Sequence, residues 1–107
     1  YMLLNVLGEK ANEPYPQHFA QGKGLQPDTK YPPLKDLVKD WDEISGKLEK
    51  KIGSMSDAEL EAKSPSPTPM GNSLRSFISF CTHHEAYTIG QMGLYRRVHG
   101  YPAMKYV

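Results

Sequence analysis

The segment from Ser73 to His99 constrains the fold most, because it holds no proline and predicts one long helix. Asn72 can serve as its N-cap, and Gly100 and Pro102 end it. At about 100° per residue, one stripe lies within about 60° of His84 and is expected to point inward. The stripe has polar residues at its middle and consists of Phe77, Phe80, Cys81, His84, Thr88, Gln91, Tyr95 and Val98. We therefore expect this helix to carry a polar centre within a helical bundle.

The opposite side of the same helix is lined by small residues, which predicts a second contact surface. A solvent-facing helix gains nothing from two glycines, since each costs about 1 kcal/mol relative to alanine. Small side chains instead let the backbone of another helix approach closely. The row consists of Ser79, Thr82, Ala86, Gly90 and Gly93, with Ile89 beside it. We therefore predict helix packing or homodimerisation through Ala86, Gly90 and Gly93.

The upstream half of the chain predicts one further long helix. Residues 1–7 are apolar enough to be the end of a helix that stops at Gly8, whereas residues 9–31 show no regular period. Apolar residues at spacings of three and four then predict a helix from Pro32-Pro33 to Gly53 with one buried stripe. The stripe consists of Leu34, Leu37, Val38, Trp41, Ile44, Leu48 and Ile52. A left-handed glycine cap is expected to end that helix at Gly53.

A short helix and a proline-rich stretch connect the two long helices. Ser56-Asp57-Ala58-Glu59 fits a capping box, which predicts a short helix through about Glu61. The stretch from Lys63 to Gly71 has a proline at every second position from 65 to 69, which excludes a helix there.

Two long helices and a helical stub cannot bury a helix that makes contacts on two sides, because a stable bundle normally needs three or four helices. The predicted fold class is therefore all-α, a four-helix up-and-down bundle formed as a single domain by residues 1–107. Its N-terminal helices are either missing from this sequence or supplied by a partner chain.

Composition excludes several classes of function. Thirteen basic and twelve acidic side chains nearly cancel, so no large field attracts nucleic acid or an anionic membrane. No apolar run approaches the roughly 20 residues that cross a bilayer, and residues 1–8 lack a secretory leader. The single cysteine, Cys81, cannot form an internal disulfide and is interpreted as a buried, reduced thiol. We therefore expect a cytoplasmic protein.

The segment His84-Glu85-Ala86-Tyr87-Thr88 nearly spells the His-Glu-x-x-His motif of zinc proteases. In that motif two imidazoles one helical turn apart bind the metal, so threonine at position 88 removes a ligand and argues against a protease. His83 lies about 100° around the helix from His84, so the two side chains cannot both point inward. His99 lies about 22 Å along the helix from His84, which excludes it from the same metal site. His18 in the long loop could reach His84, but a loop histidine is more often solvated.

A wider resemblance covers nearly the whole chain. The pattern His84-Glu85-Ala86-Tyr87, then Gly90-Gln91, Arg96-Arg97 and Gly100-x-Pro102, is similar to the last long helix of the DinB-like (DinB/YfiT) superfamily. Upstream, the segments that resemble this superfamily are Tyr1 to Gly8, Phe19-Ala20-Gln21-Gly22 with Tyr31-Pro32, and Ser56 to Leu60. The resemblance implies a four-helix bundle in which the first helix and most of the second have no counterpart here.

The resemblance also implies a type of chemistry. Members of this superfamily commonly bind zinc or nickel through three histidines, one from the second helix and two spaced His-x-x-x-His on the last. Several are thiol-dependent transferases or isomerases, in which a metal with an open position lowers the pKa of a thiol. Only His84 matches a ligand position, since Thr88 replaces the second histidine.

Two functions follow as expectations. The first is a DinB-like protein derived from metal-dependent thiol transferases, with a degenerate metal site at His84 beside a polar pocket of Thr88, Gln91 and Tyr95. Its cofactor would be zinc or nickel, and its substrate a small thiol. The alternative is a non-catalytic helical bundle that acts through homodimerisation.

Overall fold

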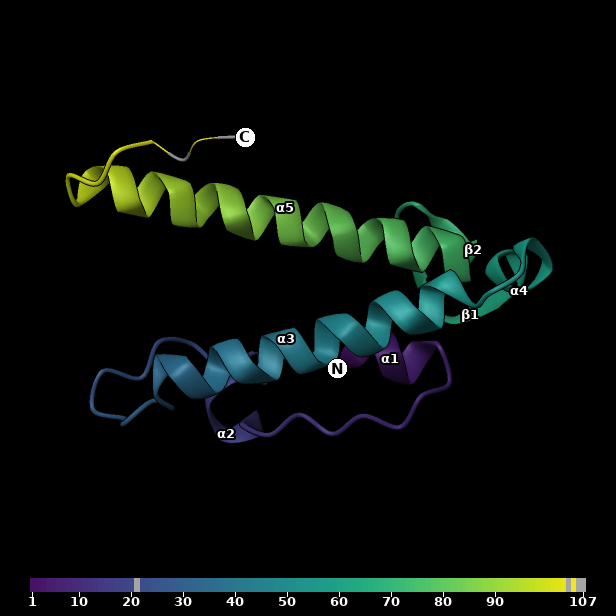
Figure 1. Ribbon diagram of the computed structural model, residues 1–107, viewed down its shortest axis with the longest axis horizontal. Helices are drawn as coiled ribbons and strands as arrows, with labels where there is room; N and C mark the ends of the chain where they lie inside the picture. The colour runs from purple at the N-terminus through teal and green to yellow at the C-terminus, as the bar shows by residue number, and fades with distance from the viewer. Residues whose placement is uncertain (21, 104, 106–107) are drawn as a thin grey trace. The chain divides into compact units, whose positions relative to one another are not determined.

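The computed structural model describes residues 1–20, 22–103 and 105 (Figure 1). Gln21, which belongs to one of the segments that carry the DinB-like resemblance, lies outside the described residues. The chain divides into two compact units, Tyr1–Asp57 and Ala58–Val107. Each unit has its own small core.

The first unit is built by packing a short helix, α1 (Met2–Val6), against a long one, α3 (Leu34–Gly53). Leu4 and Leu7 carry the packing, because both are buried. As the sequence predicts, the first helix stops before Gly8, which adopts a φ of 84° that favours glycine.

The helix α3 confirms the predicted helix, but the burial of its apolar stripe and its end differ from the prediction. No residue of α3 is buried within the described chain, and Leu34, Val38 and Trp41 are 75%, 49% and 59% exposed, because the five-residue α1 is too short to cover the whole stripe.

Asp36 in the first turn and Lys50 and Lys51 in the last complement the helix dipole. The expected left-handed cap at Gly53 is wrong, since Gly53 is the last helical residue and Ser54 follows with helical angles, φ −91° and ψ −8°. The hydroxyl of Ser54 donates a hydrogen bond to the carbonyl of Lys51 at 2.8 Å and so satisfies the helix end without a glycine turn.

The long connection between α1 and α3 is held in place by hydrogen bonds and aromatic contacts within the first unit. The side-chain amide of Asn5 donates to the carbonyl of Ala11 at 2.6 Å, and Ala11 N–H donates back to its oxygen at 3.0 Å. A four-residue helix, α2 (Pro16–Phe19), which periodicity could not reveal, brings the Phe19 ring onto Tyr31 at a centroid distance of 5.8 Å. Local aromatic contacts therefore organise this loop.

The second unit begins within a short helix, α4 (Asp57–Glu61), which confirms the helix expected after Ser56. A hairpin of β1 (Lys63–Thr68) and β2 (Gly71–Ser73) follows and leads directly into α5 (Leu74–Val98). The strands are antiparallel, with Lys63 opposite Ser73 and Thr68 opposite Gly71, and the register shifts between these two pairs.

The hairpin corrects the predicted all-α four-helix up-and-down bundle. Helix accounts for 57% and strand for 9% of the described residues, and only two of the five helices among them are long. Alternating prolines exclude a helix, but their fixed φ suits an extended strand. In a two-stranded ladder each strand is an edge, so a proline can occupy a position that needs no hydrogen-bond donor.

The final helix confirms the long predicted segment, with one correction at its start. The N-cap is Ser73 instead of Asn72: Ser73 has extended angles, and its hydroxyl accepts from Ser76 N–H at 3.2 Å. Phe77 of α5 is 4% exposed and Ser64 of β1 is 3% exposed, and α5 contacts both strands of the hairpin. The core of the second unit therefore lies at the N-terminal end of α5.

None of the helices in the described ranges combines the length and the apolar character that a bilayer crossing requires.

Candidate functional site

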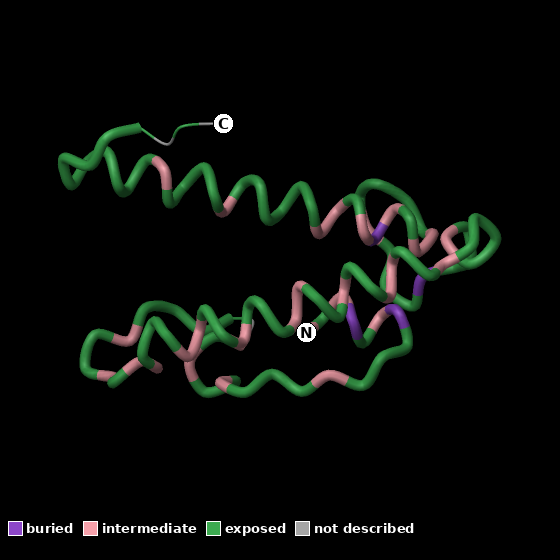
Figure 2. The backbone as a smooth tube through the Cα atoms, in the orientation of Figure 1, coloured by how far each residue is buried: buried purple, intermediate pink, exposed green. Residues whose placement is uncertain are grey.

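The C-terminal two thirds of α5 carries the predicted site residues, and most of that surface is bare. Figure 2 shows the helix largely exposed beyond its first turns. Its large apolar side chains are uncovered: Tyr87, Met92, Leu94, Tyr95 and Val98 are each at least 60% exposed, and Ile89 is 44% exposed. Exposed apolar surface of this extent is typical of a face that another helix covers.

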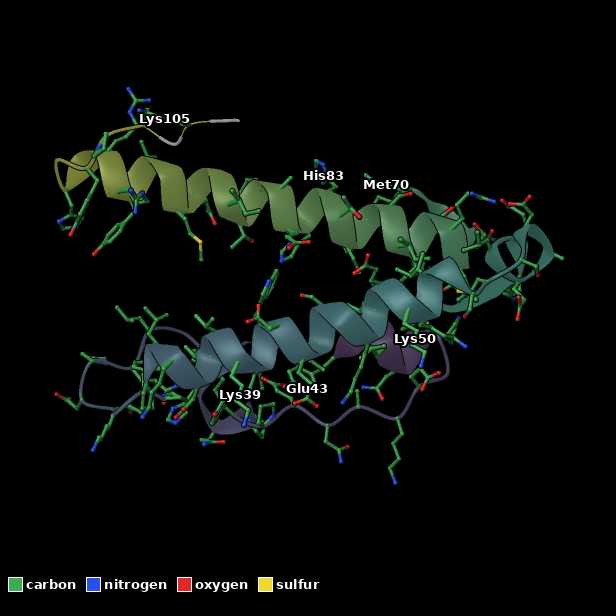
Figure 3. The ribbon with its side chains drawn as sticks, in the orientation of Figure 1. Lys39, Glu43, Lys50, Met70, His83 and Lys105 are labelled. Atoms are coloured by element: carbon green, nitrogen blue, oxygen red, sulfur yellow. The ribbon has the colours of Figure 1, made fainter. Side chains whose placement is uncertain are left out.

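The imidazole of His84 lies on this bare surface. His84 is exposed, and its ring stacks on Phe80 one turn earlier, with centroids 6.4 Å apart and an interplanar angle of 22°. His83 is also exposed, and Figure 3 shows its side chain extending from α5. The described residues of the second unit therefore do not enclose His84 in a pocket.

The three polar-pocket residues share the face of His84 but make other contacts. Thr88 is half-buried, and its hydroxyl donates a hydrogen bond to the backbone carbonyl of His84 at 3.0 Å. Gln91 is exposed, and the ring of Tyr95 contacts His99 at 4.4 Å between centroids. Over the part of the chain that the structure describes, no hydrogen bond joins the side chains of His84, Thr88 and Gln91. The Thr88 hydroxyl donates its proton within its own helix turn, and the predicted polar pocket stays a prediction.

A metal site made by this chain is a prediction that needs correction. The described residues contain no group of three or more His, Cys, Asp and Glu side chains that could hold a metal ion. On α5 the turn after His84 offers a threonine hydroxyl where a ligand would be needed. His18 instead lies in its own loop, 5.3 Å from the Tyr31 ring and 5.9 Å from the Phe19 ring, between centroids.

Cys81 has the character of a structural thiol. Its side chain is half-buried on α5, and burial raises the pKa of the thiol. A raised pKa lowers the thiolate fraction at neutral pH, and the thiolate is the nucleophile. The structure thus favours the interpretation of Cys81 as a reduced packing residue.

The small-residue face of α5 is open at its middle. A Cβ atom added to Gly90 would meet no atom within 4 Å, and Ala86 is exposed. Gly93 is half-buried. The described residues of this chain therefore do not use Gly90 for a close helix contact, and the predicted role of the three residues stays a prediction.

Two cavities in the first unit were not anticipated from the sequence. The larger, about 650 Å³, is lined by charges that neutralise one another: Lys47 pairs with Glu43 at 2.6 Å, and Lys51 lies 3.7 Å from Glu9. Figure 3 labels Glu43 and Lys50 on this part of α3.

The smaller cavity, about 450 Å³, combines aromatic walls with carboxylates. One wall is α3, where Asp40 and Trp41 face it, and the other is the loop that carries Tyr15 and Phe19. Little in the sequence indicates this cavity, because Trp41 belongs to an apolar stripe that predicts a buried core. Trp41 is instead 59% exposed.

No protein-family model, no curated protein and no solved structure matches this chain.

Proposed function

We propose that this chain acts as a helical self-association module, in which α5 of one copy pairs with α5 of a second copy to form a homodimer. The observation that carries the proposal is the bare half of α5. Ile89 and Met92 are 44% and 60% exposed on a helix that the described residues leave uncovered there. Burying such side chains is favourable by about 25 cal/mol per Å² of apolar surface.

Spacing along the helix defines the contact surface. Glu85, Ile89, Met92 and Arg96 follow one another at intervals of four, three and four residues, so they lie along one face of α5. We call this row the α5 seam. It has an apolar centre with an acidic residue at one end and a basic residue at the other. Ala86 and Gly93 border the α5 seam, so side chains beside it do not hinder close approach of a second helix.

The order of these residues favours an antiparallel pair. When two copies of the α5 seam meet in opposite directions about a two-fold axis, Glu85 of each copy lies opposite Arg96 of the other. The same symmetry places Ile89 opposite Met92. A parallel pair would instead oppose like charges. Neither Glu85 nor Arg96 has an ion-pair partner elsewhere in the described ranges, and both are exposed.

The DinB-like resemblance enters the proposal as descent. We infer that the chain derives from metal-dependent thiol transferases of that superfamily and that its own metal centre is degenerate. What supports this inference is the sequence resemblance alone, in which Thr88 stands where the second histidine ligand would be. In the cytoplasm that we propose for it, the half-buried Cys81 stays reduced.

A charge-swap experiment tests the antiparallel pair. Glu85→Arg alone or Arg96→Glu alone places like charges opposite each other twice, and each variant should dimerise at least about tenfold more weakly. Mixing the two single variants restores both oppositely charged pairs in a heterodimer. The double variant Glu85→Arg with Arg96→Glu restores them in a homodimer.

Sedimentation velocity over a range of protein concentrations measures the dimer in each case. Asp42→Arg, which reverses an exposed charge on α3 away from the α5 seam, is the matched control. Wild-type protein that stays monomeric at all concentrations would refute the proposal. Single variants that dimerise as well as the wild type would refute the antiparallel register.

A further inference from the structure

We infer that the smaller cavity of the first unit is a binding site for a quaternary ammonium group, formed by an aromatic cage with a carboxylate at its wall. The proposal is independent of self-association, because every residue that lines this cavity lies in the first unit. The cavity volume of about 450 Å³ is within the range of sites for small molecules.

The walls of the cavity are aromatic on both sides. Trp41 of α3 and three rings from upstream, Tyr1, Tyr15 and Phe19, line it. Tyr15 and Phe19 meet edge to face, with centroids 6.3 Å apart and planes at 86°, so they form a corner of two perpendicular walls. Trp41 and Phe19 are 59% and 48% exposed, which leaves ring surface for a ligand to cover. Ring faces attract cations through their quadrupoles, and several rings around one ammonium group form an aromatic cage.

The charge of the lining is negative. Asp40 and Glu13 line the cavity, and no lysine or arginine is among its lining residues. The Oδ2 atom of Asp40 is buried and has no hydrogen-bond partner within the described residues. A buried carboxylate oxygen without a partner is costly, and a cation in the cavity would compensate it.

The two tyrosines of the cavity report the same negative surroundings. Burial and the carboxylates of Asp40 and Asp36 together raise the pKa of Tyr15. Burial and the carboxylates of Asp40 and Glu43 likewise raise the pKa of Tyr1. Both hydroxyls therefore stay neutral, and the site as a whole favours a cation over an anion or a neutral ligand.

A quaternary ammonium group fits better than a primary one. Its methyl groups pack on ring faces and need no hydrogen-bond acceptors, whereas a primary ammonium has three donors to satisfy. Besides the two carboxylates, the only side-chain oxygens among the described lining residues are the hydroxyls of Tyr1 and Tyr15, so a primary ammonium would lose more on leaving water. The shared chemistry is a trimethylammonium group, carried either by a free small molecule such as choline or by a trimethyllysine side chain.

Fluorescence offers a direct test, because Trp41 is the only tryptophan in the chain. Choline chloride added at constant ionic strength, balanced with sodium chloride, should change Trp41 emission saturably, with a dissociation constant of about 1 mM or tighter. The neutral isostere, in which carbon replaces the nitrogen of choline, has the same shape without the charge. It should bind at least about tenfold more weakly.

A pair of variants tests the carboxylate. Asp40→Asn keeps the shape and removes the charge, so choline binding should fall at least about tenfold. Asp42→Asn changes an exposed carboxylate two positions further along α3 that does not line the cavity, and binding should be unchanged. Far-ultraviolet circular dichroism establishes that both variants keep their helices.

The outcomes separate the alternatives without depending on the variants. Equal binding of choline and its neutral isostere to wild-type protein would overturn the cation site and leave an apolar groove. No saturable change with choline would overturn it as well, unless a peptide that contains trimethyllysine binds. Choline binding assigns the site to a free small molecule, and tighter binding of the peptide assigns it to a modified protein tail.

Discussion

The two ends of α5 differ in what covers them, although they belong to one uninterrupted helix. At the N-terminal end Phe77 is 4% exposed, the hairpin packs against the helix, and Ser73 caps it. Towards the C-terminal end Leu94, Tyr95 and Val98 are 65%, 67% and 75% exposed. Large apolar side chains occur along the whole helix, so composition does not explain the difference.

The difference shows that the stability of α5 has two sources. The covered end is held by tertiary contacts within the second unit, whereas the second unit gives the bare end little support beyond helix propensity. In the dimer that we propose, the second copy would supply the missing contacts. Substitutions at the covered end are therefore expected to have the largest effects on stability, and substitutions at the bare end the smallest.

Phe77→Ala should give the largest loss of stability. Removing a buried phenylalanine leaves a cavity between α5 and the hairpin, and we expect the free energy of unfolding to fall by about 3–5 kcal/mol. Urea unfolding followed by circular dichroism measures the change. Tyr87→Ala, at a position that is 61% exposed, is the matched control and should change it by less than about 0.5 kcal/mol at concentrations where the protein is monomeric. Similar losses in the two variants would erase the contrast between the ends.

The same contrast separates what the sequence predicts from what it does not. Helix bounds follow from local rules, because periodicity and capping act within a few residues: the predicted segment from Ser73 to His99 forms α5, Leu74–Val98. The strands around Pro65 and Pro67 escaped prediction because proline excludes a helix there without specifying a pairing partner. Strand pairing depends on residues farther along the chain, here Gly71–Ser73.

The candidate site was harder to predict than the fold. A helical wheel places His84, Thr88 and Gln91 on one face, and the backbone of α5 does so too. The wheel cannot say what covers that face, since covering depends on other elements or on another chain. Asp40 and Trp41 were overlooked for a different reason. Trp41 belongs to an apolar stripe that predicts a core, Asp40 precedes it among several charged residues, and the loop that completes their cavity is held by aromatic contacts without any regular period.

Gly71→Ala tests what holds the hairpin to the covered end. Gly71 has a φ of 133°, and an added Cβ atom would lie 2.6 Å from the Ser76 hydroxyl oxygen, which is itself 3.0 Å from the Ser73 hydroxyl oxygen. Backbone strain and disturbance of the N-cap should together lower the free energy of unfolding by about 1–3 kcal/mol. Gly24→Ala, where nothing lies within 4 Å, is the matched control in a chemical denaturation series. An unchanged midpoint for Gly71→Ala would show that the strand can relax around the new methyl group.

Gly90→Ala should have the smallest effect, with the opposite sign, and it probes the bare end. A Cβ atom at Gly90 meets nothing within 4 Å, so only helix propensity changes, and monomeric protein should gain about 0.5–1 kcal/mol. Gly46→Ala in α3, equally open, should gain a similar amount. Gly90 lies about 100° around the helix from Ile89, so a dimer formed through the α5 seam should keep this gain at high protein concentration. Thermal melts at low and high protein concentration measure this gain in stability. If the gain becomes a loss as the dimer forms, the interface would lie at the row of Ala86, Gly90 and Gly93 instead of the α5 seam.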